Sequence, residues 1–404
     1  MIEVKKALEI ILKKLPERPS FEIISIDCAL KRILAKDYVS LHAHPATNTS
    51  AMDGYAVASQ HCHFCKKNGE FGPVEIIGTS LPAKPYNNDN SKIQGAIRVF
   101  TGATVPEGFD TIILQEESVL KDQQLYFAKP NLPWRYIRKA GMDFAKDQPL
   151  LLKGKQITSR DIGLLAMMGH HWIEVYKKPN ILVISTGNEL VLPGAKQTHK
   201  IDQMIASSGF SIKTILQEYG ANCHIAPLCT DDFKSFSDAL NMAPHFDLVI
   251  TTGGASVGEY DIVAKATQTG LLKSYFKQIK MRPGKPILFS HIRHVPVISL
   301  PGNPVSAMIG CLLFLLPALK KLSHHIGAPD DHRVRQVKIA HVLEANGPRQ
   351  HYMRAQIIKK ENTALSFVKA FDLQDSAQTL IFQQADGVIV RDPYAKQAEI
   401  GDDV

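Results

Sequence analysis

The sequence predicts an α/β protein in which a doubly wound, mostly parallel sheet is joined to β-rich modules. Short apolar runs in the second half of the chain read as buried strands, and helical patterns follow them. The strands are 180–185, 222–228, 247–252 and 295–300, and the helices are 205–218, 233–242 and 306–321. Strands that alternate with helices form a mostly parallel sheet with right-handed crossovers. Residues 71–128 and 333–395 instead alternate apolar and polar positions between turn signals, which is typical of β modules.

The composition is that of an ordinary globular protein. A chain of 404 residues, with 45% hydrophobic and 21% charged residues, has room for roughly two to four domains. The formal net charge of +8 is spread along the chain, which argues against a nucleic-acid partner and is compatible with a small anionic substrate. Six cysteines make no disulfide framework, lysines interrupt the first apolar residues, and the apolar run 311–316 is too short to span a bilayer. We therefore expect a cytoplasmic protein without a membrane partner.

The first 178 residues predict a helix, then mixed and β-rich structure. Residues 2–15 carry apolar side chains at helical spacing between lysines, which predicts an amphipathic helix. Residues 28–40 read as a helix that runs into a strand, and residues 162–168 as a further helix. Between them, a polar loop brings Asp53 to the start of a strand. This acid could be catalytic or could cap a turn, and from the sequence alone the turn is favoured.

Two polar groups in this half leave alternatives open. The two histidines and two cysteines of 61–65 lack the second pair of ligands that a metal site normally needs, so an exposed free cluster is favoured. Arg138 and Asp143 are expected to lie near each other across a turn. They could form an ion pair, or Arg138 could bind a substrate phosphate.

Four polar turns fall at one edge of the predicted sheet. In doubly wound sheets, ligands bind at the carboxyl ends of the strands. One polar turn at this edge could have a purely structural role. Four of them together are harder to explain in that way. The turns hold Glu189, Asp231, the stretch 253–261 and the stretch 301–306.

The stretch 253–261 is the most informative of the four. Gly253 and Gly254 end a buried strand, and a helix is expected to start near Asp261. A strand, a glycine turn and a helix start bring backbone N–H groups to one point, which suits an anion. Asp261 could place a divalent cation beside that anion. A tight turn with a solvated acid is the alternative, and this stretch alone slightly favours it.

Seven strings of residues together resemble one family. They are similar to the molybdopterin molybdenumtransferases, the MoeA and gephyrin E-domain family, and they follow the family's order over nearly the whole chain. The strings are SAMDGYAV (50–57), TGATVPEGFDTIILQEE (101–117), GLLAMMG (163–169), STGNEL (185–190), TTGGASVGEYD (251–261), MRPGKP (281–286) and LPGNPVSA (300–307).

The resemblance implies an elongated homodimer whose chain folds into several parts. The doubly wound domain is expected to be of the molybdopterin-binding type, joined to two β-rich modules and an elongated connecting domain. The implied parts are a helix in 1–20 that packs on the central domain, a connecting domain of 21–45 with 145–178, a β-rich module with the DGYA loop in 46–144, the doubly wound domain in 179–325 and a C-terminal β module in 326–404.

The resemblance also implies an activity. Family members act in the last step of molybdenum cofactor synthesis, where adenylylated molybdopterin is cleaved, AMP leaves and molybdate is inserted with the help of Mg²⁺. The site is expected between the doubly wound domain of one subunit and the DGYA module of the other. The adenylyltransferase of the same pathway is a possible partner.

The implied site residues are carried over position by position. Catalytic roles fall on Asp53, Asp143, Glu189, Asp231 and Asp261, of which Asp231 and Asp261 would hold Mg²⁺ as hard oxygen ligands. Arg354 and Ser376 are associated with molybdate. Substrate binding falls on Thr101, Arg138, Gly253, Gly254, Ser256, Arg282, Lys285, Pro301, Pro304, Arg354 and Ser376.

Some positions depart from the family pattern and keep other functions open. Thr47 and Thr49 replace an aromatic residue and an asparagine, Met204 replaces an amide, and Gln278 replaces a basic residue. A divergent paralogue with altered or lost activity is one alternative. The pathway's adenylyltransferase shares the TTGG and PGNP turns but lacks the extra modules. A non-catalytic scaffold ranks last, because the sequence shows no linker or tail for a partner.

Overall fold

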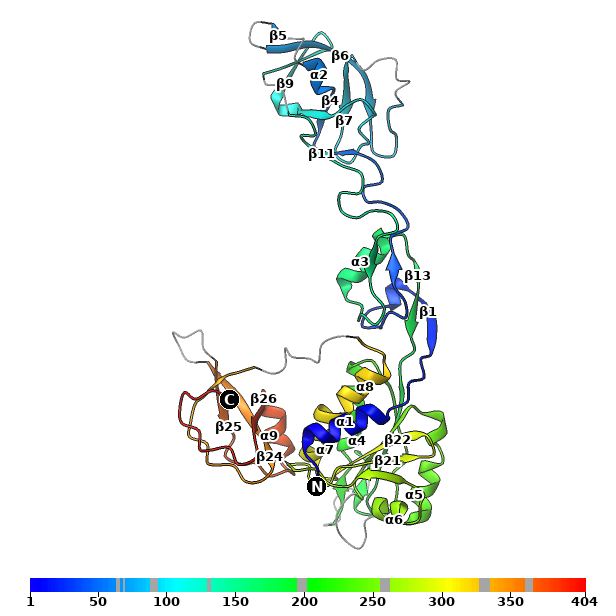
Figure 1. Cartoon of the computed structure of the whole chain (residues 1–404), viewed down its shortest axis with the longest axis vertical. Helices are drawn as coiled ribbons and strands as arrows, with labels where there is room; N and C mark the ends of the chain where they lie inside the picture. Colours follow the sequence, from blue (N-terminus) through cyan, green and yellow to red (C-terminus); the bar gives the residue numbers. More distant parts are fainter. Residues whose placement is uncertain are drawn as a thin grey trace.

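The computed structural model has the predicted fold class, an α/β domain with a mostly parallel sheet and separate β-rich modules. It describes residues 1–62, 66–67, 70–87, 94–128, 132–194, 202–254, 262–326, 335–359 and 366–404. The molecule is elongated (Figure 1). The DGYA module lies at one end, a small connecting region follows, and the doubly wound domain lies at the other end beside the C-terminal module.

The doubly wound domain is built on a six-stranded sheet with the order β17-β14-β18-β22-β21-β19. The first four strands are parallel, and the last two are antiparallel to their neighbours. The strands are β14 (Asn180–Ser185), β17 (Asn222–Ile225), β18 (Leu248–Thr252), β19 (Lys273–Phe276), β21 (Leu288–Ile292) and β22 (Val295–Leu300).

Helices cover both faces of this sheet, which is why its central strands β14, β18 and β22 are largely apolar and buried. Ile181 and Val183 of β14 pack in one core with α1, α4 and α7, while Leu182 and Ile184 face a second core with α5 and α6. The helices are α1 (Val4–Lys14), α4 (Ser208–Glu218), α5 (Phe233–Leu240), α6 (Ile262–Gln268), α7 (Pro304–Gly310) and α8 (Leu316–Leu322). The predicted amphipathic helix near the N-terminus is therefore confirmed, and it packs on the doubly wound domain.

The helix predicted for 306–321 is a single helical run from Pro304 to Leu322, with a π-helical segment Cys311–Leu315 between α7 and α8. By length and composition alone this run could cross a membrane, and in the described part of the chain it is the one helix that could. Its most apolar window is 61% buried inside the molecule. The core helix of a soluble protein is buried in the same way.

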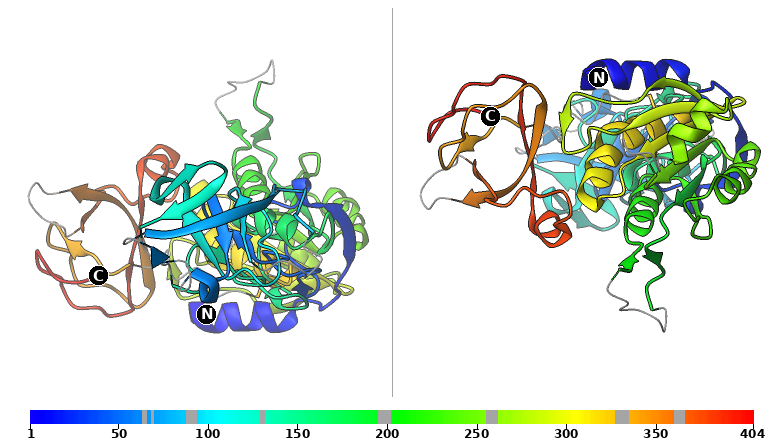
Figure 2. Two further views of the ribbon diagram at one scale, coloured as in Figure 1. Left: turned by 90° about the horizontal axis from the view of Figure 1, so that it is seen from above. Right: turned by 90° about the horizontal axis from the view of Figure 1, so that it is seen from below.

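The helix predicted to start at Ile205 begins three residues later, at Ser208. Met204–Ile205 instead forms strand β16, which pairs in parallel with β15 (Leu190–Val191). The amide of Met204 donates to the carbonyl of Glu189 at 2.8 Å, so pairing with a distant segment takes precedence over the local helical pattern. The two strands form an arm that projects from the domain (Figure 2).

The connecting region shows that the helix predicted for 28–40 is wrong. A short 3-10 turn, Ile26–Cys28, is followed by extended chain that reaches β2 (Tyr38–Val39). The amide of Leu34 donates to the carbonyl of Lys155, and that of Ala35 to Glu174. These bonds to distant segments replace helical ones. The remaining elements are β1 (Phe21–Ser25), β12 (Pro149–Leu151), α3 (Ser159–Met167) and β13 (Trp172–Tyr176).

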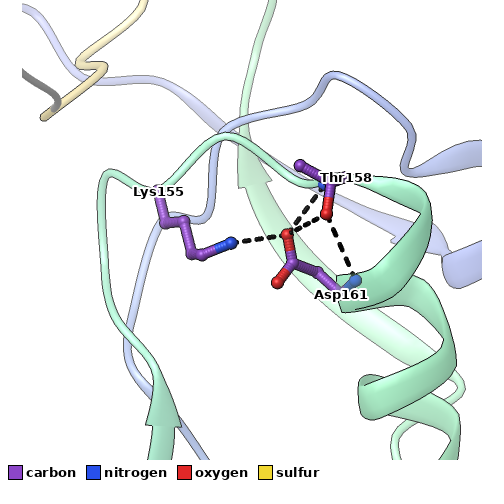
Figure 3. Close-up of polar contacts among 3 residues, drawn as sticks. All are labelled: Lys155, Thr158 and Asp161. Carbon is purple, nitrogen blue, oxygen red and sulfur yellow. Dashed lines mark hydrogen bonds and ion pairs between the residues drawn. The ribbon is translucent and has the colours of Figure 1, made fainter.

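A buried carboxylate fixes the start of α3 (Figure 3). Thr158 and Asp161 form a capping box, in which the Thr158 hydroxyl accepts from the Asp161 amide and Asp161 Oδ2 accepts from the Thr158 amide at 2.8 Å. Lys155 Nζ donates to the same oxygen at 2.5 Å. Burial alone would raise the pKa of Asp161, but the bonds from Lys155 and Thr158 outweigh it and hold the pKa below the usual 3.8.

Replacing Asp161 by asparagine should lower the free energy of unfolding by about 1 kcal/mol at pH 7. Because the folded-state pKa lies below the unfolded value, the carboxylate stabilises the fold above that value. The advantage over Asp161→Asn should therefore shrink as the pH falls through 3.8 and below. Thermal midpoints of both proteins between pH 7 and pH 3 measure this. A difference that stays constant with pH would show that ionisation of Asp161 does not matter.

The DGYA module is a seven-stranded sheet with the order β8-β4-β7-β6-β10-β9, and β5 pairs with β6. The strand predicted for 110–116 is confirmed over Thr111–Leu114 and ends in a 3-10 turn, Gln115–Glu117. A separate pair, β3 (Thr49–Ser50) with β11 (Ile137–Arg138), holds the loop that leads to Asp53. The sheet strands are β4 (Gly54–Val57), β5 (Lys66–Lys67), β6 (Glu70–Ser80), β7 (Ala96–Val99), β8 (Thr111–Leu114), β9 (Ser118–Lys121) and β10 (Gln124–Phe127). The short helix α2 is Ser59–Cys62.

The C-terminal module takes one strand from the preceding sequence. Met281–Arg282 forms β20, which pairs in parallel with β24 and so ties the module to the doubly wound domain. Tyr352 of β24 also packs into the core of that domain. The other elements are β23 (Lys338–Ile339), β24 (Gln350–Lys359), β25 (Ser366–Ala370), α9 (Thr379–Gln384) and β26 (Gly387–Arg391).

Candidate active site

The turns after four parallel strands form one continuous rim, beginning with Asn188 and Asp231. The Asn188 amide donates to Asp231 Oδ2 at 3.2 Å, and the Asp231 amide donates to Asn188 Oδ1 at 3.0 Å. This reciprocal pair holds the turn after β17 against the turn after β14. The exposed Glu189 follows directly, so the predicted convergence of Glu189 and Asp231 is observed.

The rim continues from β14 to the glycine turn after β18. The Thr186 amide donates to the carbonyl of Thr252 at 2.9 Å, and the Gly253 amide donates to Leu300 at 3.3 Å. Gly253 has φ +86°, and a Cβ on it would lie 2.2 Å from the carbonyl oxygen of Thr186. The close approach of the two turns therefore requires glycine at 253, for both its positive φ and its missing side chain.

The last link of the rim joins the proline turn to the C-terminal module. Asn303 Nδ2 donates to Ser376 Oγ at 2.9 Å, and the Val305 amide donates to the carbonyl of Ser376 at 3.1 Å. The structure thus brings Ser376 to the turn of Pro301 and Pro304 within one chain. Contacts between neighbouring turns thus connect one end of this edge of the sheet to the other, through Asp231, Asn188, Gly253, Asn303 and Ser376.

Arg354, which the resemblance associates with molybdate, is buried in the structure. Its side chain is only 2% exposed, and its guanidinium bonds the loop that carries Ser376. Nε donates to Gln374 Oε1 at 3.2 Å, Nη1 to the carbonyl of Asp375 at 2.7 Å, and Nη2 to that of Leu373 at 3.3 Å. The guanidinium of Arg354 therefore holds the Ser376 loop in place. The buried Arg354 side chain is not exposed for direct contact with a ligand.

Replacing Arg354 by lysine should lower the free energy of unfolding by about 3 kcal/mol. An ammonium group cannot reproduce the forked contacts with three loop residues, and the carbonyls would lose their donors. Urea unfolding measures this, with the exposed Arg160→Lys as the control, expected to change stability by less than about 0.5 kcal/mol. An Arg354→Lys protein as stable as the native one would show that the guanidinium does not hold this loop.

The rim has a basic side where β20 meets β24. Arg282 is exposed at the end of β20, opposite His351 in the register, and Lys285 follows after the turn. Burial lowers the pKa of His351 to about 4, helped by the positive charges of Arg282, Arg349 and Arg354. His351 is therefore neutral at pH 7, and the field around it is positive. Such a field favours an anionic ligand.

A second polar group lies in the DGYA module. Asp53 Oδ1 accepts from the Thr101 amide at 2.8 Å and from its hydroxyl at 2.9 Å, so the structure brings these two predicted site residues into direct contact. These two bonds, in that order, lower the pKa of Asp53, and the charge of Arg98 adds to them against a small opposing effect of burial. Asp53 is therefore an anion at neutral pH and a weak proton acceptor. It suits the role of a fixed negative charge or cation ligand.

Arg138 and Asp143 both lie along the loop that leads to Asp53. Arg138 is paired with Thr49 in the β3–β11 ribbon, and the Asp143 amide donates to the carbonyl of His44 at 3.0 Å. Both side chains are exposed. Between these two described side chains no ion pair forms, so the structure does not support the ion-pair interpretation.

Strand β4, which Asp53 directly precedes, and strand β22, which ends at the rim, lie in modules at opposite ends of the molecule (Figure 1). The connecting region separates the DGYA module from the doubly wound domain. A single copy of the chain therefore does not bring Asp53 to Glu189 and Asp231.

Several predicted site residues cannot be placed. Ser256 and Asp261 lie outside the described residues, as do His63 and Cys65 of the 61–65 cluster. Within the described ranges, no three His, Cys, Asp or Glu side chains gather closely enough to hold a metal ion. Asp231 alone of the predicted Mg²⁺ pair can be described. Its Oδ2 accepts the Asn188 amide, and Oδ1 has no hydrogen bond within the described chain.

Comparison with known proteins defines the class. Residues 2–169 match the family model described as "MoeA N-terminal region (domain I and II)", and residues 182–321 match "Probable molybdopterin binding domain". A molybdopterin-binding α/β domain preceded by the MoeA N-terminal modules is thus the class that the fold and rim define.

Full-length relatives identify the family. The molybdopterin molybdenumtransferase of Haemophilus influenzae is 32% identical over 80% of this chain and 78% of its own length. Gephyrin of Dictyostelium discoideum is 29% identical over 96% of this chain, which spans 60% of that relative. The MoeA protein structure from Pyrococcus horikoshii superposes with a TM-score of 0.84 at 25% identity, covering 100% of this chain and 98% of that one. The chain belongs to the MoeA and gephyrin E-domain family.

Sequence reasoning missed the residues that hold the site together. Asn188 and Asn303 stand inside the TGNEL and PGNP strings but were not singled out, although a side-chain amide in a strand-end turn is a usual turn-bridging group. His351 and Gln374 gave no signal, because their environment depends on pairing between segments far apart in the chain.

Proposed function

We propose that this chain inserts molybdate into adenylylated molybdopterin with release of AMP. The single observation that carries the proposal is the continuous rim from Asp231 through Gly253 to Ser376, in a chain of this family. The rim offers backbone N–H groups, hydroxyls and carboxylates side by side. A ligand with a pterin, a pyrophosphate and an adjacent oxyanion needs these groups together.

The basic side of the rim suits the anionic parts of such a substrate. Arg282 and Lys285 stand in the positive field around His351, which would favour the pyrophosphate oxygens. Ser376 is a hydroxyl donor held at the proline turn by Asn303, and it suits molybdate, a tetrahedral dianion. The buried Arg354 adds positive charge near Ser376 and keeps the Ser376 loop in place.

The acidic side suits Mg²⁺. Carboxylate oxygens are the protein ligands that Mg²⁺ prefers, and it usually keeps several waters besides one or two of them. Asp231 would supply a ligand through Oδ1, because the Asn188 amide already holds Oδ2. When bound, Mg²⁺ would neutralise charge that develops on the pyrophosphate.

The position of Asp53 supports a site completed by a second copy of the chain. Asp53 and Thr101 form a fixed anionic group at the far end of the molecule from the rim (Figure 1). A symmetric dimer would bring the DGYA module of each subunit to the rim of the other. We therefore propose a homodimer whose active sites contain residues of both subunits. The adenylyltransferase of the same pathway is the proposed partner that hands over the substrate.

Release of AMP tests the proposal directly. The purified full chain is incubated with adenylylated molybdopterin, Mg²⁺ and molybdate, and AMP is measured by chromatography. We expect molybdate-dependent release, a loss of about 10²-fold or more in Asp231→Asn, and no change in Asp238→Asn, an exposed acid of α5 in the same domain. AMP at the level of a no-enzyme blank would exclude this activity and favour a paralogue that has lost it.

A further inference from the structure

Arg98, on β7 of the DGYA module, contacts the residues next to both members of the Asp53–Thr101 pair. Its guanidinium carbon lies 4.8 Å from the ring centre of Tyr55 and 4.9 Å from that of Phe100. Tyr55 stands two residues after Asp53, and Phe100 directly precedes Thr101. A planar guanidinium stacks on aromatic faces in this way, and an ammonium group does not.

The polar contacts of Arg98 lead to the same place. Nη1 donates to the carbonyl of Gly54 at 3.4 Å, and Nη2 donates to Gln115 Oε1. The backbone amide of Gln115 in turn donates to the carbonyl of Asp53 at 3.3 Å. Arg98 is thus bonded to the residue after Asp53 and to the residue that holds the Asp53 carbonyl.

The carboxylate of Asp53 has few other constraints. It is exposed, and its hydrogen bonds in the described structure all end on Oδ1, from Thr101. An exposed carboxylate that must meet a ligand from another subunit depends on its backbone for direction.

We propose that Arg98 is a positioning residue for Asp53, which fixes the direction of the carboxylate through Gly54, Gln115 and the two aromatic rings. Arg98 does not need to touch the substrate for this. The catalytic consequence rests on the proposed function, whereas the effect on Asp53 itself does not.

The test compares Arg98→Met, Arg98→Lys and a matched control in the full chain. Lys121→Met is the control, because Lys121 also places a positive charge over an aromatic ring of this module, with Nζ 5.2 Å from the ring centre of Tyr126. Carboxyl ¹³C resonances of labelled aspartate are followed against pH, with Asp53→Asn as the assignment variant. AMP release is measured over the same pH range.

In Arg98→Met we expect the carboxyl resonance of Asp53 to move at neutral pH and kcat to fall by about tenfold to hundredfold, because the carboxylate loses its fixed direction. Arg98→Lys keeps the charge but loses the fork and the stacking, so it should lower kcat by a similar factor. Lys121→Met should change neither. If Arg98→Met does not fold, Arg98→Gln replaces it in the same comparison.

An Asp53 carboxyl resonance at the same position in the native protein and Arg98→Met would overturn the proposal, even if the variant were less stable. So would an Arg98→Lys protein with native kcat. If the native protein releases no AMP, the proposed function fails, but the position of the carboxyl resonance still decides whether Arg98 acts on Asp53.

Discussion

Replacing Gly253 by alanine should lower the free energy of unfolding by about 3 kcal/mol or more and abolish AMP release. The added Cβ would lie 2.2 Å from the Thr186 carbonyl oxygen and 3.0 Å from its hydroxyl. Contacts this short to backbone cannot be relieved by rotating a side chain. The turn after β18 would have to move away from the turn after β14, and the rim would open at its centre.

The matched control is Gly270→Ala, in the turn after α6. Gly270 has φ +80°, close to the +86° of Gly253, but a Cβ on it would meet nothing within 4 Å. It should therefore cost about 1 kcal/mol, the penalty of left-handed backbone alone, and leave AMP release intact. Urea unfolding and AMP release are measured on both proteins. Equal losses of stability in Gly253→Ala and Gly270→Ala would show that the close approach of the turns at 186 and 253 does not contribute to stability.

The strand ends that make the rim could be predicted because their signal is local. β14 and β22 have the predicted bounds, since each is a continuous apolar run closed by a polar turn, and both faces of the sheet are buried. Once the strand ends are known, the parallel sheet brings Glu189 and Asp231 to one edge without further information. This part of the site follows from periodicity and topology.

The failures occur where a distant segment competes with a local pattern. Residues 28–40 contain good helix formers, yet Leu34 and Ala35 bond to Lys155 and Glu174, more than a hundred residues away. The burial of Arg354 could not be predicted, because the sequence does not show that its guanidinium bonds the loop 371–378. The sequence also does not predict the pairing of β20 with β24, which places Arg282 beside His351.

A heterodimer of two inactive variants should recover about half of the native activity, which is the expected signature of a site shared between two subunits. Asp53→Asn and Asp231→Asn are each expected to lose about 10²-fold or more in AMP release. In a dimer with one copy of each variant, one shared site would contain both Asp53→Asn and Asp231→Asn. The other site would combine the native Asp53 of one chain with the native Asp231 of the other.

The heterodimer is made by co-expression with two different tags and purified on both. Asp53→Asn paired with a differently tagged Asp53→Asn is the control, and it should stay inactive because neither of its sites has the native acid. If each site were formed within one chain, every site of the mixed dimer would carry one change, and activity would stay at the level of the single variants. That result would contradict the shared site, and the separation of Asp53 from the rim within one chain would then need a different explanation (Figure 1).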